Sequence, residues 1–207
     1  MDDHSGDTGW RGSMDGWLEA AYEALLEGGV DAVKILPLAK RLKLSRTSFY
    51  WFFRDREELL AALIARWRDK NTGNLIRQAE AYAESIAEAT LNVFDCWLDR
   101  NLFDAKFEFA IRSWALQSEE ILKEVQAADN ARLAALGRMF ERFGHEPVAA
   151  DVRARTLYLV QIGYISMQTE EDLELRLKRI PEYVAIFTGT TPEPREMDRF
   201  LARHKAG

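Results

Sequence analysis

The sequence contains almost no cysteine. Its one cysteine, Cys96, stands in a chain of 207 residues and has no second thiol for an internal disulfide, a pattern typical of the reducing cytosol. No apolar run approaches the roughly 20 residues that a membrane span needs. The opening MDDHSGDTGW also lacks the apolar centre of a signal peptide. These absences argue against a disulfide scaffold and a membrane-spanning protein, and we expect a cytoplasmic one.

Histidine is nearly as scarce. His4, His145 and His204 are scattered, and none has a metal-ligand spacing with cysteine, aspartate or glutamate. The chain also lacks a glycine-rich phosphate loop, a G-x-S-x-G motif and an H-E-x-x-H motif. We therefore expect no metal site, no cofactor and no catalytic residues, and the sequence does not favour an enzyme.

Proline and alternating β-branched residues are scarce too. The chain has five prolines and twelve glycines, and its apolar residues recur every three or four positions, which predicts an all-α protein of about nine helices. The expected helices span 13–28, 36–43, 46–52, a stretch that begins after Asp55, 76–101, 104–117, 119–143, 148–168 and 172–188. The polar segment 69–74 is expected to bend or break the chain between two functional regions.

Basic residues gather in one part of an acidic chain. The net charge of the whole is −6, yet segment 34–56 holds seven basic residues and one acidic residue, so it carries +6 and the remainder −12. This distribution excludes a uniformly basic coat and favours a local surface that docks a polyanion. The simpler alternative is a solvated charged face, but aromatic and small polar residues interleave with the charge. We infer a DNA-binding segment.

This segment has the pattern of two short helices joined by a tight turn. Such a pair can place its second helix, here 46–52, across the major groove of DNA. Ser45 can cap this helix through its hydroxyl. Phe49 and Phe53 lie four residues apart, and we expect them to anchor the helix to a core.

The outer face of that helix carries the side chains that DNA contacts require. Arg46 is long enough for a bidentate contact with guanine, and Thr47 suits a thymine methyl group or a phosphate. Tyr50 can donate a hydrogen bond to a phosphate oxygen, and the start of the following helix favours an anion. The predicted DNA-binding residues are Lys34, Ser45, Arg46, Thr47, Tyr50, Trp51, Arg54 and Arg56.

The run LSRTSFYWFFRDREELL, residues 44–60, resembles the recognition helix and following helix of the TetR family of bacterial transcriptional regulators. The preceding ILPLAKRLKL resembles that family's second helix, and the resemblance covers roughly residues 13–62. Three positions depart from the family pattern. Lys43 replaces the usual glycine of the turn, Phe52 replaces a histidine or tyrosine that commonly touches phosphate, and Lys34 stands where a threonine usually caps the second helix.

The resemblance implies a function that the residues alone do not. TetR-family proteins are homodimers that bind a palindromic operator and usually repress nearby genes. A small molecule that enters the C-terminal domain changes the spacing of the two DNA-binding heads and releases the DNA. We therefore expect a sequence-specific DNA-binding transcriptional regulator, most simply a ligand-released repressor, whose effector is unknown.

This interpretation divides the chain into four parts. We expect a disordered N-terminal tail at 1–12 and a helix-turn-helix DNA-binding domain at 13–60. A C-terminal regulatory and dimerisation domain follows at 61–190. The last part, 191–207, is a polar tail with room for one short helix at about 194–204.

The region after the DNA-binding domain is rich in aromatic residues. An aromatic set at helical spacing is usually core, but as a set it could also line an apolar ligand cavity with a few polar groups. If the site lies where the family resemblance suggests, the residues expected to contact a ligand are Trp97, Phe107, Ile111, Trp114, Tyr158 and Gln161.

The sequence YLVQIGYISM, residues 158–167, is apolar on more than one face. A helix of this kind is buried on two sides, either as a central core helix or at an interface between subunits. With the family resemblance, we expect a homodimer through the helices near 148–168 and 172–188.

Two rival interpretations remain open at this stage. A helical scaffold for protein partners would explain the acidic body, but not the arginines and tyrosine on one short helix. An activator, or a regulator that responds to a protein partner, would carry the same DNA-binding unit. The sequence does not distinguish an activator or a partner-controlled regulator from a ligand-released repressor.

Overall fold

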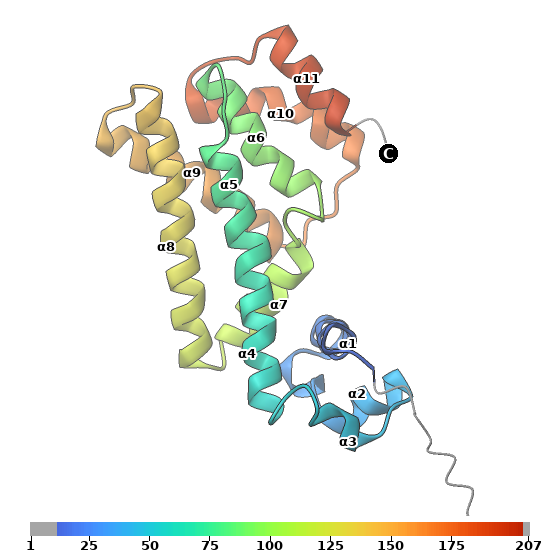
Figure 1. Cartoon of the computed structure of the whole chain (residues 1–207). Coiled ribbons are helices and arrows are strands. Elements are labelled where there is room, and N and C mark those ends of the chain that lie inside the picture. The colour runs from blue at the N-terminus through green and yellow to red at the C-terminus, as the bar shows by residue number, and fades with distance from the viewer. Residues whose placement is uncertain (1–11, 205–207) are drawn as a thin grey trace, which may run out of the picture. The chain divides into compact units, whose positions relative to one another are not determined.

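The computed structural model describes residues 12–204, and the regular structure within them is helical, without strands (Figure 1). The predicted all-α class, with a small N-terminal DNA-binding part and a larger C-terminal part, is confirmed. The elements are α1 (Met14–Gly28), the 3₁₀ turn η1 (Val30–Ala32), α2 (Ile35–Leu42), α3 (Arg46–Phe49), α4 (Arg56–Trp67), the π-helix η2 (Arg68–Gly73), α5 (Asn74–Glu80), α6 (Ile86–Leu98), α7 (Ala105–Ala115), α8 (Glu119–Arg142), α9 (Pro147–Ser166), α10 (Leu173–Thr188) and α11 (Pro194–His204).

The chain divides into two compact units between Arg66 and Trp67. The N-terminal unit thus includes nearly all of α4, whereas the expected domain 13–60 includes only its beginning. The expected tail at 1–12 lies, apart from Gly12, outside the described residues. The short helix expected near 194–204 is present as α11.

Aromatic packing holds the N-terminal unit together. Ser13 caps α1 by accepting a hydrogen bond from the Gly16 backbone N–H at 3.0 Å. The Trp17 ring on α1 meets the Phe49 ring edge to face at a centroid distance of 5.2 Å. Phe49 in turn stacks on Phe53 at 5.5 Å. Phe49 and Phe53 are both buried, as predicted, so they fix the position of α3 in this unit.

The turn between α2 and α3 depends on a strained residue. Lys43 adopts a left-handed conformation with φ 55° and ψ 38°. This geometry lets the Leu44 backbone N–H reach the Ala39 carbonyl at 2.9 Å and so closes the end of α2. Glycine adopts this conformation without the steric cost that a side chain brings. The turn therefore keeps its shape despite the lysine, with some loss of stability.

In the C-terminal unit, α8 packs along α9, while α6 packs against α5, α10 and α11 (Figure 1). Ion pairs fasten α11 to α6, including Arg199 to Glu88 at 2.6 Å and Arg203 to Asp95 at 3.0 Å. Cys96 on α6 is fully buried, and that burial raises the pKa of its thiol to about 12. A thiol with this pKa is scarcely ionised near neutral pH, which fits a structural rather than a reactive cysteine.

Two helix predictions in this region are wrong. The single helix expected at 76–101 is split into α5 and α6 by the segment 81–85. Ser85 caps α6 by accepting from the Glu88 N–H at 3.0 Å, and Glu88 accepts from the Glu84 N–H at 2.8 Å. This reciprocal pair is close to a capping box, a signal that is visible in the sequence.

The second correction concerns the polar segment 69–74. This segment does not break the helix, because the π-helix η2 follows α4 directly and continues into α5. Its polar residues Asn71 and Thr72 are buried and hydrogen-bonded within the C-terminal unit. A polar sequence that suggests a loop is here a π-helix whose side chains have buried partners.

We predict that Lys43→Gly stabilises the protein. The substitution removes the steric cost of a left-handed lysine, so the free energy of unfolding should rise by roughly 0.5–1 kcal/mol after the flexibility of glycine is counted. Urea denaturation measures the change. Lys40→Gly is the matched control, because Lys40 lies within α2 and glycine there should cost about 1 kcal/mol. Equal destabilisation by both substitutions would contradict the prediction.

Candidate functional site

The N-terminal unit presents the predicted DNA-reading residues on the outside of one short helix. Ser45 caps α3 by accepting from the Ser48 N–H at 3.3 Å. Arg46 and Thr47 are exposed, and so are Tyr50 and Trp51 in the turn that follows. The α-helix ends at Phe49 rather than at the expected residue 52, so Tyr50 and Trp51 lie in the turn and not in the helix.

Arg46 and Tyr50 form one exposed unit. The Arg46 Nη2 donates to the Tyr50 hydroxyl at 3.0 Å, and its guanidinium lies 5.8 Å from the tyrosine ring centroid. The hydroxyl proton of Tyr50 remains available for a phosphate oxygen. The pair therefore combines a cation suited to a base edge with a donor suited to the DNA backbone.

Arg54 and Glu58 shape the start of α4. The Asp55 Oδ1 accepts from the Glu58 N–H at 2.8 Å, which is the expected cap. Glu58 accepts instead from the Arg54 N–H at 2.6 Å, and this hydrogen bond lowers the pKa of the Glu58 carboxyl. The Arg54 side chain is 84% exposed and pairs with Glu58 at 3.1 Å. Its guanidinium is thus at the surface with most of its donors directed to solvent.

Two other arginines of segment 34–56 form hydrogen bonds or ion pairs with residues of the same unit. Arg56 donates from Nε to the Val33 carbonyl at 2.6 Å and from Nη2 to the Val30 carbonyl at 2.7 Å. Arg41 on α2 pairs with Glu23 of α1 at 3.3 Å and also with Glu27. Arg56 therefore holds η1 and α4 together, and its assignment as a DNA contact stays a prediction.

Lys34 precedes α2 and its side chain forms no cap with that helix. The family usually has a capping threonine at this position, and the lysine found here does not cap α2. The exposed ammonium group is left at the surface. The exposed cations of segment 34–56 thus include the lysines together with Arg41, Arg46 and Arg54, of which Arg41 and Arg54 pair with glutamates.

The six predicted ligand residues lie in several environments, and their contact with a ligand stays a prediction. Only Trp97 and Gln161 line the cleft between α6, α9 and α10. Phe107 and Ile111 are fully buried on α7. Of the other two, Trp114 is half-buried on the same helix, and Tyr158 belongs to a buried polar network.

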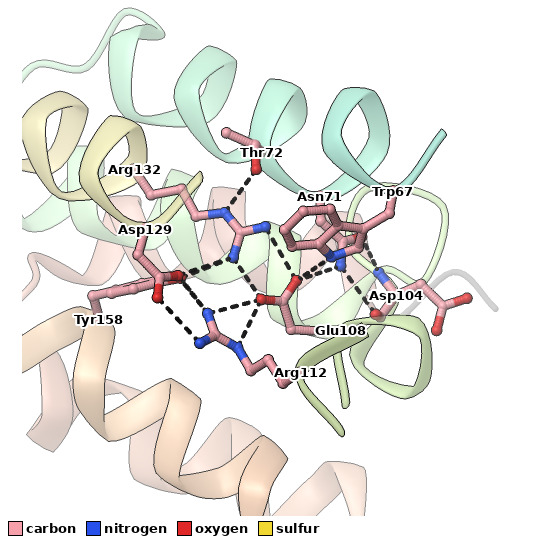
Figure 2. A network of polar contacts seen from close by, with 9 residues as sticks. All are labelled: Trp67, Asn71, Thr72, Asp104, Glu108, Arg112, Asp129, Arg132 and Tyr158. Carbon is pink, nitrogen blue, oxygen red and sulfur yellow. Dashed lines mark hydrogen bonds and ion pairs between the residues drawn. The ribbon is translucent and has the colours of Figure 1, made fainter. Parts of the chain in front are cut away.

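A fully buried ion pair lies at the centre of this network (Figure 2). Arg132 of α8 donates to both carboxylate oxygens of Glu108 of α7, at 2.7 and 3.1 Å, and neither side chain is exposed. Burial by itself would raise the pKa of Glu108. The charges and hydrogen bonds of Arg132 and Arg112 outweigh it and lower the pKa to about 2. Glu108 is therefore ionised at neutral pH.

Further side chains extend the network from two elements, the last residue of α4 and the π-helix η2. Glu108 also accepts from Trp67 Nε1 at 2.7 Å and from Asn71 Nδ2 at 2.9 Å. Arg132 Nε donates to the Thr72 hydroxyl at 2.9 Å. These hydrogen bonds connect Trp67 and the π-helix η2 to α7 and α8, as Figure 2 shows.

On its other side the network reaches α9. The Tyr158 hydroxyl accepts from Arg132 at 2.8 Å and from Arg112 at 3.0 Å, and donates to Asp129 at 2.5 Å. Two arginines thus meet two carboxylates, so the cluster is neutral and its members have partners. Such a cluster fixes the helices relative to one another and leaves no unpaired charge for a ligand.

Sequence reasoning missed Glu108 and Arg132 as a site. The one available signal was spacing, because Glu108 and Arg112 are four residues apart and Asp129 and Arg132 are three apart. That spacing is usual for exposed pairs on a helix surface. Only the packing of α7 against α8 shows that these charges are internal.

The N-terminal unit is similar to a known family of DNA-binding domains. Residues 18–63 match the family model of the tetR family of bacterial regulatory proteins. The N-terminal unit carries a TetR-family domain. The match coincides with α1 to α4, and it confirms the resemblance seen in the sequence. TetR-family regulators are DNA-binding transcriptional regulators.

Solved structures show that the fold extends beyond the TetR-family domain. A transcriptional regulator of the TerR/AcrR family from Aquifex aeolicus VF5 is 20% identical, with TM-score 0.63, covering 84% of this chain and 99% of that one. Salmonella enterica GusR is 14% identical, with TM-score 0.60 and coverage of 93% and 95%. The reduced form of E. coli NemR is 17% identical, with TM-score 0.60 and coverage of 87% and 99%.

At these identities the structures share a fold with this chain and nothing finer. No curated protein sequence is similar enough to count as a match. Among residues 12–204, no helix combines the length and the apolar character that crossing a membrane requires.

We predict that Arg132→Met destabilises the protein by about 3–5 kcal/mol, because it leaves Glu108 buried without its main counter-charge. Adding Glu108→Gln should recover part of this loss, which gives a coupling energy of roughly 1–3 kcal/mol at neutral pH. Denaturation of the single and double variants measures the coupling. Arg138→Met is the control, because Arg138 makes an exposed pair with Glu80 that should contribute little.

This coupling should depend on pH in a defined direction. The pKa of Glu108 is about 2 in the folded protein and about 4.3 in an unfolded chain. Its contribution to stability is therefore complete above the unfolded value and is lost as the pH falls through the folded value. The coupling energy should be the same at pH values of about 6 and 7 and smaller at about 2.5. A coupling that does not change with acidification would refute the assignment.

Proposed function

We propose that this protein is a sequence-specific DNA-binding repressor that a small-molecule ligand releases from its operator. The observation that carries the proposal is the arrangement of α2, the turn and α3. It buries Phe49 while it exposes Arg46, Thr47 and Tyr50 together. This arrangement fits a recognition helix whose outer side chains reach base edges and phosphates in the major groove.

A palindromic operator requires a second copy of the chain, and α9 and α10 suit that role. Large apolar side chains are exposed along both helices, including Val152, Leu159 and Ile186. The opposite side of α9 is buried through Leu157 and Tyr158. A helix that is apolar on two sides, one of them uncovered, fits an interface between subunits. We propose that α9 and α10 pair with the same helices of a second copy.

The C-terminal unit is the proposed site of regulation. It extends from Trp67 and is far larger than DNA binding requires. The protein from Aquifex aeolicus VF5 that shares this fold is a transcriptional regulator, which agrees with a regulatory unit joined to a DNA-binding one. An activator, or a regulator controlled by a protein partner, would carry the same DNA-binding unit and is the alternative proposal.

Selection of bound sites from a random duplex pool at fixed salt tests DNA recognition. We expect an enriched palindrome whose half-sites lie about one helical turn apart, as two symmetric recognition helices require. Binding that shows no enriched motif, and only weakens as salt rises, would be non-specific and would contradict the proposal.

Two arginine variants test the roles of individual contacts. Arg46→Ala should lower discrimination between the operator and scrambled DNA by about 1–3 kcal/mol, because a base contact is lost. Arg54→Ala should weaken binding to both DNAs by similar factors, because a phosphate contact carries no sequence information. Gel-shift titrations of both DNAs with each variant give the comparison. The division of roles fails if the two variants lose discrimination equally.

We also predict that Leu159→Arg prevents dimer formation. It places a charge on the exposed apolar side of α9, where Leu159 is 57% exposed and would be covered in the dimer. Sedimentation equilibrium should show monomers with unchanged helical content. Leu116→Arg is the control, because Leu116 is 87% exposed but lies at the end of α7. A dimer that survives Leu159→Arg would place the interface elsewhere.

A further inference from the structure

Aromatic rings from three helices line the cleft between α6, α9 and α10. Phe94 and Trp97 of α6 meet edge to face at a centroid distance of 5.1 Å. Phe187 of α10 stacks against Phe94 at 6.5 Å and against Tyr183 at 5.7 Å. Tyr164 of α9 completes these walls. The walls are thus flat, apolar ring faces of the kind that bind another ring.

An arginine of this cleft has a neutral hydrogen-bond partner. Arg176 of α10 donates to the Gln161 side-chain oxygen at 3.2 Å. It forms no ion pair with any carboxylate in the described part of the chain. Glu171, the acidic residue of the lining, is paired with Arg179. Burial lowers the pKa of the Arg176 guanidinium, and the nearby charge of Glu171 offsets this effect only in part.

Another polar group of the same lining, the Trp97 indole N–H, has no hydrogen-bond partner. Trp97 is about nine-tenths buried, and its indole N–H makes no hydrogen bond. An unsatisfied buried donor loses its hydrogen bond to water and gains none in return. Native proteins seldom retain such a donor without a reason, and a ligand that is absent from the structure is one such reason.

The arginines of the buried network and of the cleft differ in their partners. In the network of Glu108, Arg112, Asp129, Arg132 and Tyr158, each arginine is matched by a carboxylate. In the cleft, Arg176 donates to the neutral Gln161 side chain and has no ion pair with a carboxylate in the described part of the chain, and the Trp97 N–H has no acceptor. A planar carboxylate could accept hydrogen bonds from both donors, and guanidinium binds carboxylate in a bidentate manner.

We propose that this cleft binds a small aromatic carboxylate, whose charge Arg176 neutralises and whose ring packs among the aromatic walls. Trp97 donates its N–H to the carboxylate, and Gln161 orients Arg176. The site rests on the proposed ligand-released function and deepens it, because it names the chemical class of the effector and the residues that recognise it.

The size of the cleft suggests how binding affects the fold. Its cavity volume is about 20 Å³, which is room for little more than one water molecule. An aromatic ring can enter only if α10 moves away from α6 or α9. Because α9 and α10 are also the proposed contact between subunits, the same movement changes the geometry of the dimer. Ligand binding and the spacing of the DNA-binding units would be coupled in this way.

The test uses sodium benzoate as the probe and benzamide as its uncharged counterpart, titrated into the full chain by calorimetry. Benzoate should bind at least about tenfold more tightly than benzamide, since a hydrogen-bonded charge is worth about 1.5–3 kcal/mol. Equal binding of the two compounds, or no binding of benzoate in the millimolar range, would overturn the proposal.

Variants assign the effect to named groups. Arg176→Met should weaken benzoate binding at least about tenfold and leave benzamide binding nearly unchanged. Trp97→Phe keeps a ring but removes the N–H, and should weaken benzoate binding roughly three- to tenfold. Arg138→Met removes an exposed arginine of α8 and should change neither affinity. A loss of benzoate binding equal in Arg176→Met and Arg138→Met would contradict the assigned site.

Operator binding separates this inference from the proposed function. The selected operator duplex is titrated with each protein in the presence and absence of benzoate. Binding of benzoate through Arg176, with unchanged operator affinity, would uphold the site and refute release by this ligand. Release of the operator by another compound, with no benzoate binding, would uphold a ligand-released regulator and overturn the site.

Discussion

The buried pair between Glu108 and Arg132 is the interaction on which the C-terminal unit depends. Through it, and through the groups that it holds, the π-helix η2, α7, α8 and α9 share one set of hydrogen bonds (Figure 2). Taking two charges out of water is costly, and the cost is offset only when their remaining donors and acceptors are also satisfied. That requirement fixes the relative positions of the helices more narrowly than apolar packing would, because a shift of one helix leaves a buried charge unpaired.

The DNA-binding unit divides its cations between internal contacts and the surface. Arg56 donates to backbone carbonyls inside the unit, whereas Arg41, Arg46 and Arg54 are exposed. Arg41 and Arg54 are each paired with a glutamate. The unit is therefore less basic on its outer side than its sequence implies. The turn that positions α3 requires a left-handed residue at position 43. Lysine adopts this conformation there, although its side chain makes the conformation less favourable than it would be for glycine.

The presence or absence of partners distinguishes the two polar regions of the C-terminal unit. Where each charge has a partner, as around Arg132, the region holds the helices together. Where an arginine has only a neutral acceptor and an indole N–H has none, as at Arg176 and Trp97, we propose a ligand site. The cleft adjoins α9 and α10, the helices with uncovered apolar side chains. The proposed ligand site and the proposed subunit contact thus share the same two helices.

The sequence by itself determined the helical class, the DNA-reading segment and its TetR resemblance, because periodicity, caps and the order of residues along α2 and α3 are local properties. It also predicted buried Phe49 and Phe53. The break at 81–85 carries a local capping signal that the sequence contains. The sequence did not reveal the helical course of η2 or the burial of Glu108 and Arg132. Only the tertiary structure decided these, because a charged or polar residue becomes internal when distant helices supply its partners, and no local pattern records which helices will meet.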